Sequence, residues 1–326
     1  MKPRRFWITA PFCVPALVSS ISPARSAQPY WPDALLIATA SAGGTYHAYG
    51  IGLARILSRE LGVSVATRDT AGPSENITLL EEGVAQIAFV TKSAAVEGWT
   101  GSGDWTGGRP LRAMRAMFAM YDTPFHFVAR QDSGIAQISA LDGRTVGVGP
   151  EGGTAAIYTP RMLPRLGVQA RLVHGSWEEL AAQLRSGEVD GLAAAAGVPF
   201  PALAELEAGR AIRYLPLTQD MVVSLRLAVP ELAASVIPAG SYASLRSNYN
   251  TVGIYNLAVG HRDLPSDLVY RLVKTVFDFH AEMMEAHPAA AATVPANFVQ
   301  NTVLPWHLGA TRYYENRAVQ GVLFGD

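Results

Sequence analysis

The chain has 326 residues, of which 49% are hydrophobic and 16% are charged, and its formal net charge is −1. This composition excludes an intrinsically disordered chain, and the length is sufficient for two domains with sizeable cores. The near balance of acidic and basic residues disfavours nucleic acid as a partner, because proteins that bind it carry clustered positive charge.

The first 27 residues have the layout of a secretory signal peptide. Three basic residues precede an apolar run over residues 6–18, and small residues follow up to Ala27. The run is too short for a membrane-spanning helix and contains two prolines. We therefore predict a signal peptide over residues 1–27, cleavage between Ala24 and Ala27, and a periplasmic mature protein.

Loss of this segment changes the chemistry of the chain. The only cysteine, Cys13, leaves with it, so the mature protein has no thiol and no disulfide. Four basic residues and no acidic residue are also lost, which moves the net charge from −1 to −5. We expect a mildly acidic exported protein whose stability depends on the size of its core.

Residues 34–62 predict a strand, a glycine loop and a helix in succession. The apolar run 34–38 is typical of a buried parallel strand, and Gly43 and Gly44 allow a sharp turn. Apolar residues then recur at helical spacing from Tyr46. The first amides of such a helix lack intrahelical partners and attract a carboxylate or phosphate. The same glycines also suit an ordinary strand-to-helix turn.

A second copy of this pattern favours the binding interpretation. Residues 145–173 again give a strand, Gly-Gly-Thr at 152–154, and a helix, and residues 183–195 match 79–90 as a helix end, a glycine and a strand. A duplicated unit predicts an α/β protein of two similar lobes with a cleft between them. Ligands in open α/β sheets bind beyond the carboxyl ends of the strands.

Polar residues are predicted at the same edge of the first lobe. Ser74 is the predicted cap of a helix and Asn76 lies in its first turn, although capping alone also accounts for both. A third loop, Thr91 to Ser93, follows the strand 86–90 and contains Lys92, which has the alternative of a solvated surface lysine.

The tryptophan-bearing, glycine-rich segment 98–109 is predicted as a loop that is either a lid over the cleft or a surface connection. After it, strands are expected over 111–120 and 125–129, and a helix over 219–233. An extended run over 249–259 returns the chain, and a long helix follows with apolar residues from 269 to 283.

These elements divide the chain into two lobes. We assign residues 28–129 and 250–326 to lobe I and 130–249 to lobe II. The discontinuous first lobe requires two crossings, which is the arrangement of a hinge that closes two lobes on a ligand.

Seven motifs in their order resemble the TAXI solute receptors of tripartite ATP-independent periplasmic (TRAP) transporters. They cover nearly all of the mature chain and are AGGTYHAYG (42–50), AGPSENITLLEEGVAQIAFV (71–90), GVGPEGGT (147–154), LRSGEVDGLAAAAGVPFPALAEL (184–206), IPAGSY (237–242), LVYRLVKTVFD (268–278) and LPWHLGATRYYE (304–315).

The resemblance implies a periplasmic-binding-protein fold (type II-like) with a cleft between hinged lobes. It also implies a small organic acid or amino acid as ligand, delivery to a TRAP permease in the inner membrane, and a monomer. The predicted ligand-binding residues are Gly43, Gly44, Thr45, Tyr46, Ser74, Asn76, Thr91, Lys92, Ser93, Gly153, Thr154 and Gly197. Tyr46 or a tryptophan of the 99–105 segment is expected to form an apolar wall.

Two positions depart from the family pattern. The second-lobe loop is usually Ser-Gly-Thr in the family, whereas here Gly153 precedes Thr154 with Gly152 before it, which removes one hydroxyl contact. Ser93 stands where an acidic residue, able to pair with a ligand ammonium, is common in the family. With Lys92 adjacent, this tilts the expected ligand from an amino acid towards a mono- or dicarboxylate.

Two other function classes compete with a transport receptor. Against an enzyme, the sequence has no GxSxG or HExxH motif, and the histidines, including His126, His174 and His307, are scattered. We predict no catalytic residue, metal or cofactor. A sensor input module that presents its ligand to a membrane kinase uses the same closure, so the sequence leaves that alternative open.

Overall fold

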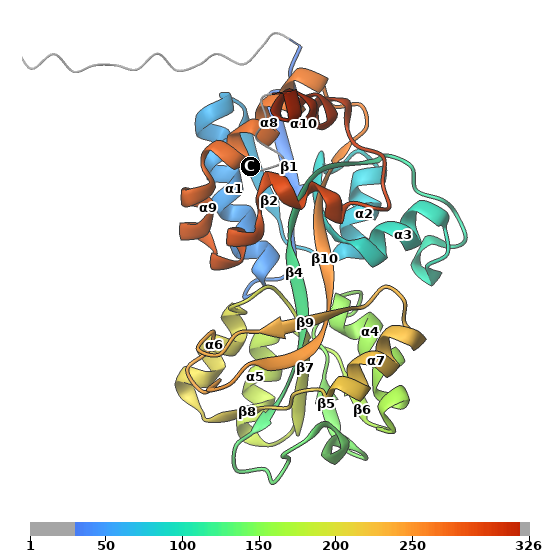
Figure 1. The fold of residues 1–326 in the computed structure, drawn as a ribbon, viewed down its shortest axis with the longest axis vertical. Helices are drawn as coiled ribbons and strands as arrows, with labels where there is room; N and C mark the ends of the chain where they lie inside the picture. Colours follow the sequence, from blue (N-terminus) through green and yellow to red (C-terminus); the bar gives the residue numbers. More distant parts are fainter. Residues whose placement is uncertain (1–29, 320–326) are drawn as a thin grey trace, which may run out of the picture.

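The computed structural model describes residues 30–319 and shows two α/β lobes, one above the other (Figure 1). The predicted signal peptide and Cys13 lie outside these residues. Within the described range, none of the helices combines the length and the apolar character needed to cross a membrane. The two-lobe α/β fold predicted from the duplicated unit is confirmed.

The first lobe contains three parallel strands, each followed by a helix, in the order β1 (Ala34–Ala38), α1 (Thr45–Leu61), β2 (Ser64–Arg68), α2 (Pro73–Glu81), β3 (Ile87–Thr91) and α3 (Lys92–Thr100). Strand β1 pairs with β2 on one side and with β3 on the other. All five residues of β3 are buried, as the apolar run predicts for a parallel strand covered on both faces.

The second lobe repeats this plan with shorter strands. Its elements are β5 (Thr145–Gly147), α4 (Thr154–Met162), β6 (Arg171–Val173), α5 (Trp177–Ser186), β7 (Gly191–Ala195), α6 (Pro201–Gly209), β8 (Ile212–Tyr214), α7 (Gln219–Ala228) and β9 (Ala233–Ile237). Strand β5 lies between β6 and β7 and is parallel to both. The predicted capping box of Ser176 and Glu179 is formed at the start of α5.

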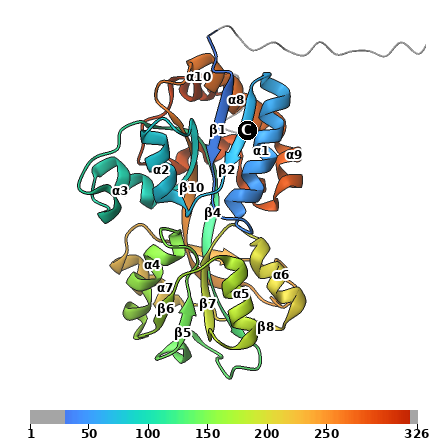
Figure 2. The same ribbon diagram turned by 180° about the vertical axis from the view of Figure 1, so that it is seen from behind.

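Two long antiparallel strands join the lobes. Strands β4 (Met114–Arg130) and β10 (Tyr249–His261) run through both lobes, as Figures 1 and 2 show. Strand β4 pairs with β10 as far as Pro124 and with β7 from Phe125 onwards. The two strands therefore form the connection about which the lobes can hinge.

Two sequence expectations about these elements were wrong. Strand β4 is continuous, although we expected a break before Phe125. Pro124 lies where β4 changes its pairing from β10 to β7, so the N–H that proline lacks is not needed for a hydrogen bond between strands. Helix α7 ends at Ala228, and Ala233–Ile237 forms β9 against β10. Pro230 lies between the two elements and cannot continue a helix.

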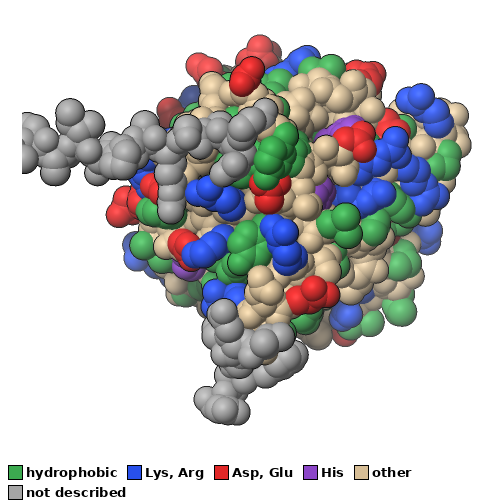
Figure 3. Space-filling model, turned by 90° about the horizontal axis from the view of Figure 1, so that it is seen from above, with side chains coloured by type: hydrophobic (Ala, Val, Ile, Leu, Met, Phe, Trp, Pro, Cys, Tyr) green, Lys and Arg blue, Asp and Glu red, His purple; other side chains and the backbone are tan. Residues whose placement is uncertain are grey.

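The C-terminal helices complete the first lobe. They are α8 (Ser266–Asp278), α9 (His280–Ala286) and α10 (Leu308–Val319). They share a hydrophobic core with α1 on one face of the sheet, while α2 and α3 lie on the other (Figure 2). The predicted long helix is interrupted at Phe279. Acidic and basic side chains both spread over the face of this lobe seen in Figure 3.

Candidate ligand-binding site

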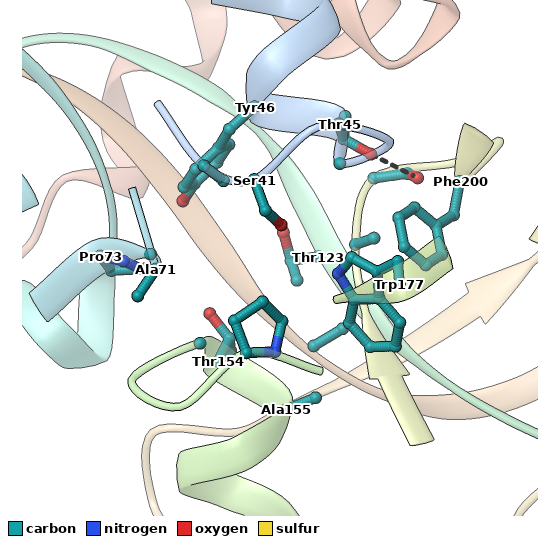
Figure 4. Close-up of a pocket in the computed structure, with 18 of the residues that line it drawn as sticks. Ser41, Thr45, Tyr46, Ala71, Pro73, Thr123, Thr154, Ala155, Trp177 and Phe200 are labelled. Carbon is teal, nitrogen blue, oxygen red and sulfur yellow. Dashed lines mark hydrogen bonds between the residues drawn. The ribbon is translucent and has the colours of Figure 1, made fainter. Parts of the chain in front are cut away.

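A cavity lies between the two lobes, where the carboxyl ends of their strands meet (Figure 4). The centre of a water molecule can reach about 60 Å³ of it. Residues of both lobes line it, namely Ala40, Ser41, Gly44, Thr45, Tyr46, Ala71, Gly72, Pro73, Tyr121, Thr123, Val148, Pro150, Gly153, Thr154, Ala155, Trp177, Ala195, Ala196, Gly197 and Phe200. This space has room for roughly four to six water-sized groups, which is the scale of a short organic acid.

Three helices begin at this cavity without a side-chain cap. Helices α1, α2 and α4 start after Gly44, Gly72 and Gly153, and no side-chain hydrogen bond caps any of them. By contrast, Thr91 caps α3 and Ser176 caps α5. The first amides of α1 and α4 are thus left for a ligand, at the positive ends of their helix dipoles. Helix α2 begins with Pro73, which has no N–H, so its first amide is that of Ser74.

The two lobes touch around the cavity. Thr45 in the first lobe donates a buried hydrogen bond of 3.1 Å from Oγ1 to the carbonyl oxygen of Gly197 in the second. Arg161 of α4 lies 3.2 Å from Glu97 of α3, nitrogen to carboxylate oxygen, across the same cleft. The structure therefore represents a closed arrangement of the lobes.

Hydroxyl groups provide most of the side-chain polarity of the lining. The hydroxyl of Tyr121 is buried and has no hydrogen-bond partner among the described residues. Burial raises the pKa of Tyr121 well above its ordinary value, so the hydroxyl keeps its proton and can donate it. Thr123 Oγ1 accepts a hydrogen bond of 2.6 Å from Asn256, which leaves the threonine proton available.

Asn256 fixes the hinge side of this cavity. Its side-chain oxygen accepts a 2.7 Å bond from Tyr46, and its amide nitrogen also donates to the backbone oxygen of Tyr121. It lies at the register shift of β10, between Tyr255 and Leu257. One fully buried amide thus holds α1 and β4 in fixed positions relative to each other.

Aromatic rings and small residues form the remaining walls. Trp177 and Phe200 pack edge to face on one side, with ring centroids 5.1 Å apart, and Ala71 and Pro73 lie on the opposite side (Figure 4). Among the described residues that line the cavity, none has a charged side chain. Helix dipoles and hydroxyl groups are therefore the local sources of positive potential.

The comparison with protein families agrees with this architecture. The NMT1-like family matches residues 37–317, most of the chain. The chain belongs to the NMT1-like family.

Solved structures show the same fold at low sequence identity. The periplasmic binding protein BugD superposes on the NMT1-like chain with a TM-score of 0.58 and 16% identity, over 90% of this chain and 99% of BugD. MatC from Rhodopseudomonas palustris with bound malate gives a TM-score of 0.58 and 14% identity, over 90% of this chain and 100% of MatC. These matches show that the chain has the periplasmic-binding-protein fold.

The structure places half of the predicted ligand-binding residues at the cavity of this NMT1-like protein. The residues that line it are Gly44, Thr45, Tyr46, Gly153, Thr154 and Gly197. The residues that lie outside the lining are Gly43, Ser74, Asn76, Thr91, Lys92 and Ser93.

Asn76 is committed to the structure of the first lobe. Its amide nitrogen donates to the backbone oxygens of Thr39 and Phe89, at 2.7 and 2.8 Å, and its oxygen accepts a 2.6 Å bond from Thr70. Ser74 is not the cap of α2, because that helix begins at Pro73 after Gly72. The Ser74 hydroxyl is buried without a partner in the described part of the chain.

The third predicted loop is the start of a helix. Thr91 caps α3 through a 3.2 Å bond from the amide of Ala94, and its hydroxyl also contacts that of Ser93 at 3.0 Å. Partial burial lowers the pKa of Lys92. These side chains therefore belong to the first turn of α3 and not to the cavity lining.

The segment 98–109 does not reach the cavity lining. Its residues continue α3 to Thr100 and then form a 3-10 helix over Asp104–Thr106. Trp105 donates a 3.1 Å bond to Glu97, so both its ring and its N–H are used within the first lobe. The aromatic wall comes instead from Tyr46, Tyr121, Trp177 and Phe200.

Sequence reasoning missed several lining residues, among them Ser41, Tyr121, Thr123, Trp177 and Phe200. A signal for Trp177 was present, because it follows the capping-box serine of a helix at the same edge of the second lobe. Phe200 had no comparable signal, since it lies in a loop that only tertiary packing brings to the cleft.

Proposed function

We propose that this protein is a periplasmic receptor of the TAXI type, which captures a small carboxylate between its lobes and delivers it to a TRAP permease. The observation that supports this most strongly is the convergence of three uncapped helix N-termini on one cavity without charged lining residues. Such amides bind an anion well because they supply donors and a favourable dipole together.

The lining favours an acid without an ammonium group. An amino acid would bring its ammonium into a cavity whose described lining has no carboxylate to pair with it. An unpaired buried charge is costly. A keto, hydroxy or simple carboxylic acid needs only donors, and MatC, which shares the fold, holds malate. Gly44, Thr45, Tyr46, Gly153, Thr154 and Gly197 are the predicted contacts that this proposal retains.

Closure follows from contacts with both lobes. A ligand that touches α1 and α4 at once binds the closed state more tightly than the open state, and so shifts the population towards closure. No covalent chemistry is required of the protein in this scheme, which returns its ligand unchanged.

Isothermal titration with matched pairs of acids tests the ligand class. The two pairs are pyruvate with alanine and 2-oxoglutarate with glutamate. Within each pair, the first acid has a keto oxygen where the second has an ammonium group. We expect the keto acid of at least one pair to bind at least tenfold more tightly than its amino acid. Preference for the amino acid in both pairs would reject the proposed ligand class.

Variants test the site itself. Replacing Thr45 and Thr154 together by alanine removes two lining hydroxyls, and we expect binding to weaken by at least tenfold with retained folding. Ser93→Ala, outside the lining, is the matched control. Delivery to a permease is tested separately, by deleting the gene and measuring uptake of the bound acid; unchanged uptake with confirmed binding would favour a sensing role.

A further inference from the structure

A second, larger cavity adjoins the ligand cavity. The centre of a water molecule can reach about 330 Å³ of it, against about 60 Å³ of the inner one. Its lining consists of Ala42, Gly43, Trp177, Glu178, Ala181, Arg185, Ala202, Glu205 and Leu206. Trp177 is the one residue that the described linings of the two cavities share. Trp177 therefore lies at the boundary between them.

The indole of Trp177 is held firmly in this position. The residue is only 9% exposed, and its ring packs on Phe200 at 82°. On another side, a Cβ atom placed on Gly149 would lie 2.4 Å from Cζ2 of the indole, so the ring fills the space that this glycine leaves open. Trp177 is also the first residue of α5, whose start the Ser176 capping box fixes.

The outer cavity has a small apolar floor within a lining that is mainly polar. Ala181 and Leu206 are buried and Ala202 is half-buried, whereas Glu178, Arg185 and Glu205 are exposed. Within residues 30–319 none of these three charged side chains forms an ion pair. A hydrocarbon chain would gain free energy by burial against this floor.

We propose that Trp177 sets the upper size limit of the ligand by separating the inner cavity from the outer one, which is a latent subsite for the apolar tail of a longer carboxylic acid. This inference rests on the proposed binding of a carboxylate. The anion stays at the amides of α1, α2 and α4, and the indole ends the space available to its tail. Removing the indole joins the two cavities.

A series of unbranched acids from acetate to octanoate tests this proposal on the purified full-length mature protein. We expect the wild type to bind the short acids and to lose affinity once the tail exceeds the inner cavity. In Trp177→Ala the longer acids gain roughly fourfold in affinity for each methylene group that enters the outer cavity. Hexanoate should therefore bind at least tenfold more tightly to the variant than to the wild type, while affinity for acetate does not rise.

Three further variants make the result specific. Trp177→Leu leaves less empty volume than Trp177→Ala and should raise the chain-length limit by a smaller amount. This variant keeps the test available if the alanine variant folds poorly. Trp99→Ala removes a tryptophan outside both linings and should leave the chain-length profile unchanged. Ala202→Leu, added to Trp177→Ala, narrows the outer cavity and should cancel the gain for hexanoate.

The outcomes separate this inference from the proposed function. If the wild type binds short acids but both Trp177 variants keep its chain-length profile, Trp177 is not the limit and the inference is overturned alone. If Ala202→Leu does not reduce the gain in hexanoate affinity, the tail does not bind in the outer cavity and the proposed subsite is wrong. If the wild type binds no acid of the series and neither keto acid, the carboxylate proposal fails and this inference fails with it.

Discussion

The backbones of Gly72 and Gly153 meet so closely across the cleft that a side chain added at Gly72 would crowd the opposite loop. A Cβ atom placed on Gly72 would lie 3.1 Å from Cα of Gly153 and 3.2 Å from the oxygen of Gly152. Gly72 also has a φ of +145°, which side chains rarely adopt. These glycines are the N-caps of α2 and α4, so the contact brings two anion-binding helix ends to one place.

Gly72→Ala should therefore impair closure and weaken ligand binding by at least tenfold. The added methyl group keeps the lobes apart, and the amides of α2 and α4 then no longer reach one anion. Titration calorimetry measures the affinity, and small-angle scattering with saturating acid measures whether the protein still contracts. Gly83→Ala is the matched control, because Gly83 also has a positive φ, of +72°, but nothing lies within 4 Å of its added Cβ. Equal affinities of the two variants would contradict the prediction.

The ion pair between Glu97 and Arg161 supplies a second, weaker contact between the lobes. The Glu97 side chain is only 10% exposed and is further held by Trp105, whereas the Arg161 side chain is 45% exposed. Because solvent screens such a pair, we expect Arg161→Gln to weaken binding by at most about fivefold, equivalent to about 1 kcal/mol. Calorimetry at low and high salt checks this, since the loss should shrink as salt rises.

Arg165 provides the control for that substitution. It follows the same helix and forms no ion pair within the part of the chain that the structure describes. Arg165→Gln should leave the affinity and its salt dependence unchanged. A loss in Arg161→Gln that persists undiminished at high salt would show that the effect does not come from the ion pair.

The Tyr121 side chain lines the ligand cavity, and its buried hydroxyl has no hydrogen-bond partner among the described residues. Tyr121→Phe should weaken binding by roughly three- to tenfold, the range of one net hydrogen bond. The melting temperature of the empty protein should not fall, because no bond is lost in it. Tyr214→Phe is the control, since its hydroxyl is also buried without a partner in the described chain but lies outside the cavity lining. Weakening by both variants alike would argue against a ligand contact.

The sequence predicts the duplicated scaffold well because glycine loops and helical periodicity are local signals. Gly44 and Gly153 lie where a short loop must end a strand and start a helix, and both reach the cavity. By contrast, Asn76 has the residue type and position of a ligand contact, yet its side-chain nitrogen already donates to the backbone oxygens of Thr39 and Phe89. The sequence does not show that a side chain is hydrogen-bonded to backbone groups far along the chain.

The aromatic wall shows the same limit. Tyr121 and Thr123 lie where β4 passes between the lobes, and Trp177 comes from the second lobe, so their convergence depends on how the two lobes meet. The tryptophans of residues 98–109 were the more conspicuous candidates, but their loop packs within the first lobe. Composition identifies residues able to form a wall, whereas tertiary packing decides which of them do.

His126 makes the stability of the fold sensitive to acid. It is fully buried in β4, and the Tyr242 hydroxyl, which accepts the amide proton of Phe200, lies 2.8 Å from its Nε2. The tyrosine proton is thus free for the imidazole nitrogen, an arrangement that favours neutral histidine. Burial lowers the pKa of His126 from an ordinary 6.5 to about 4.

The pKa of His126 is lower in the folded protein than in the unfolded chain. As the pH falls from 6.5 towards 4, His126 therefore binds a proton in the unfolded chain but not in the folded protein. His126 should therefore reduce the free energy of unfolding by about 2 kcal/mol between pH 7 and pH 5. Urea denaturation at both values checks this, and His126→Gln should show a correspondingly smaller fall. His174 is exposed, and we expect the free energy of unfolding of His174→Gln to fall as much as that of the wild type. An equal fall in all three proteins would mean that His126 is not the group that resists protonation.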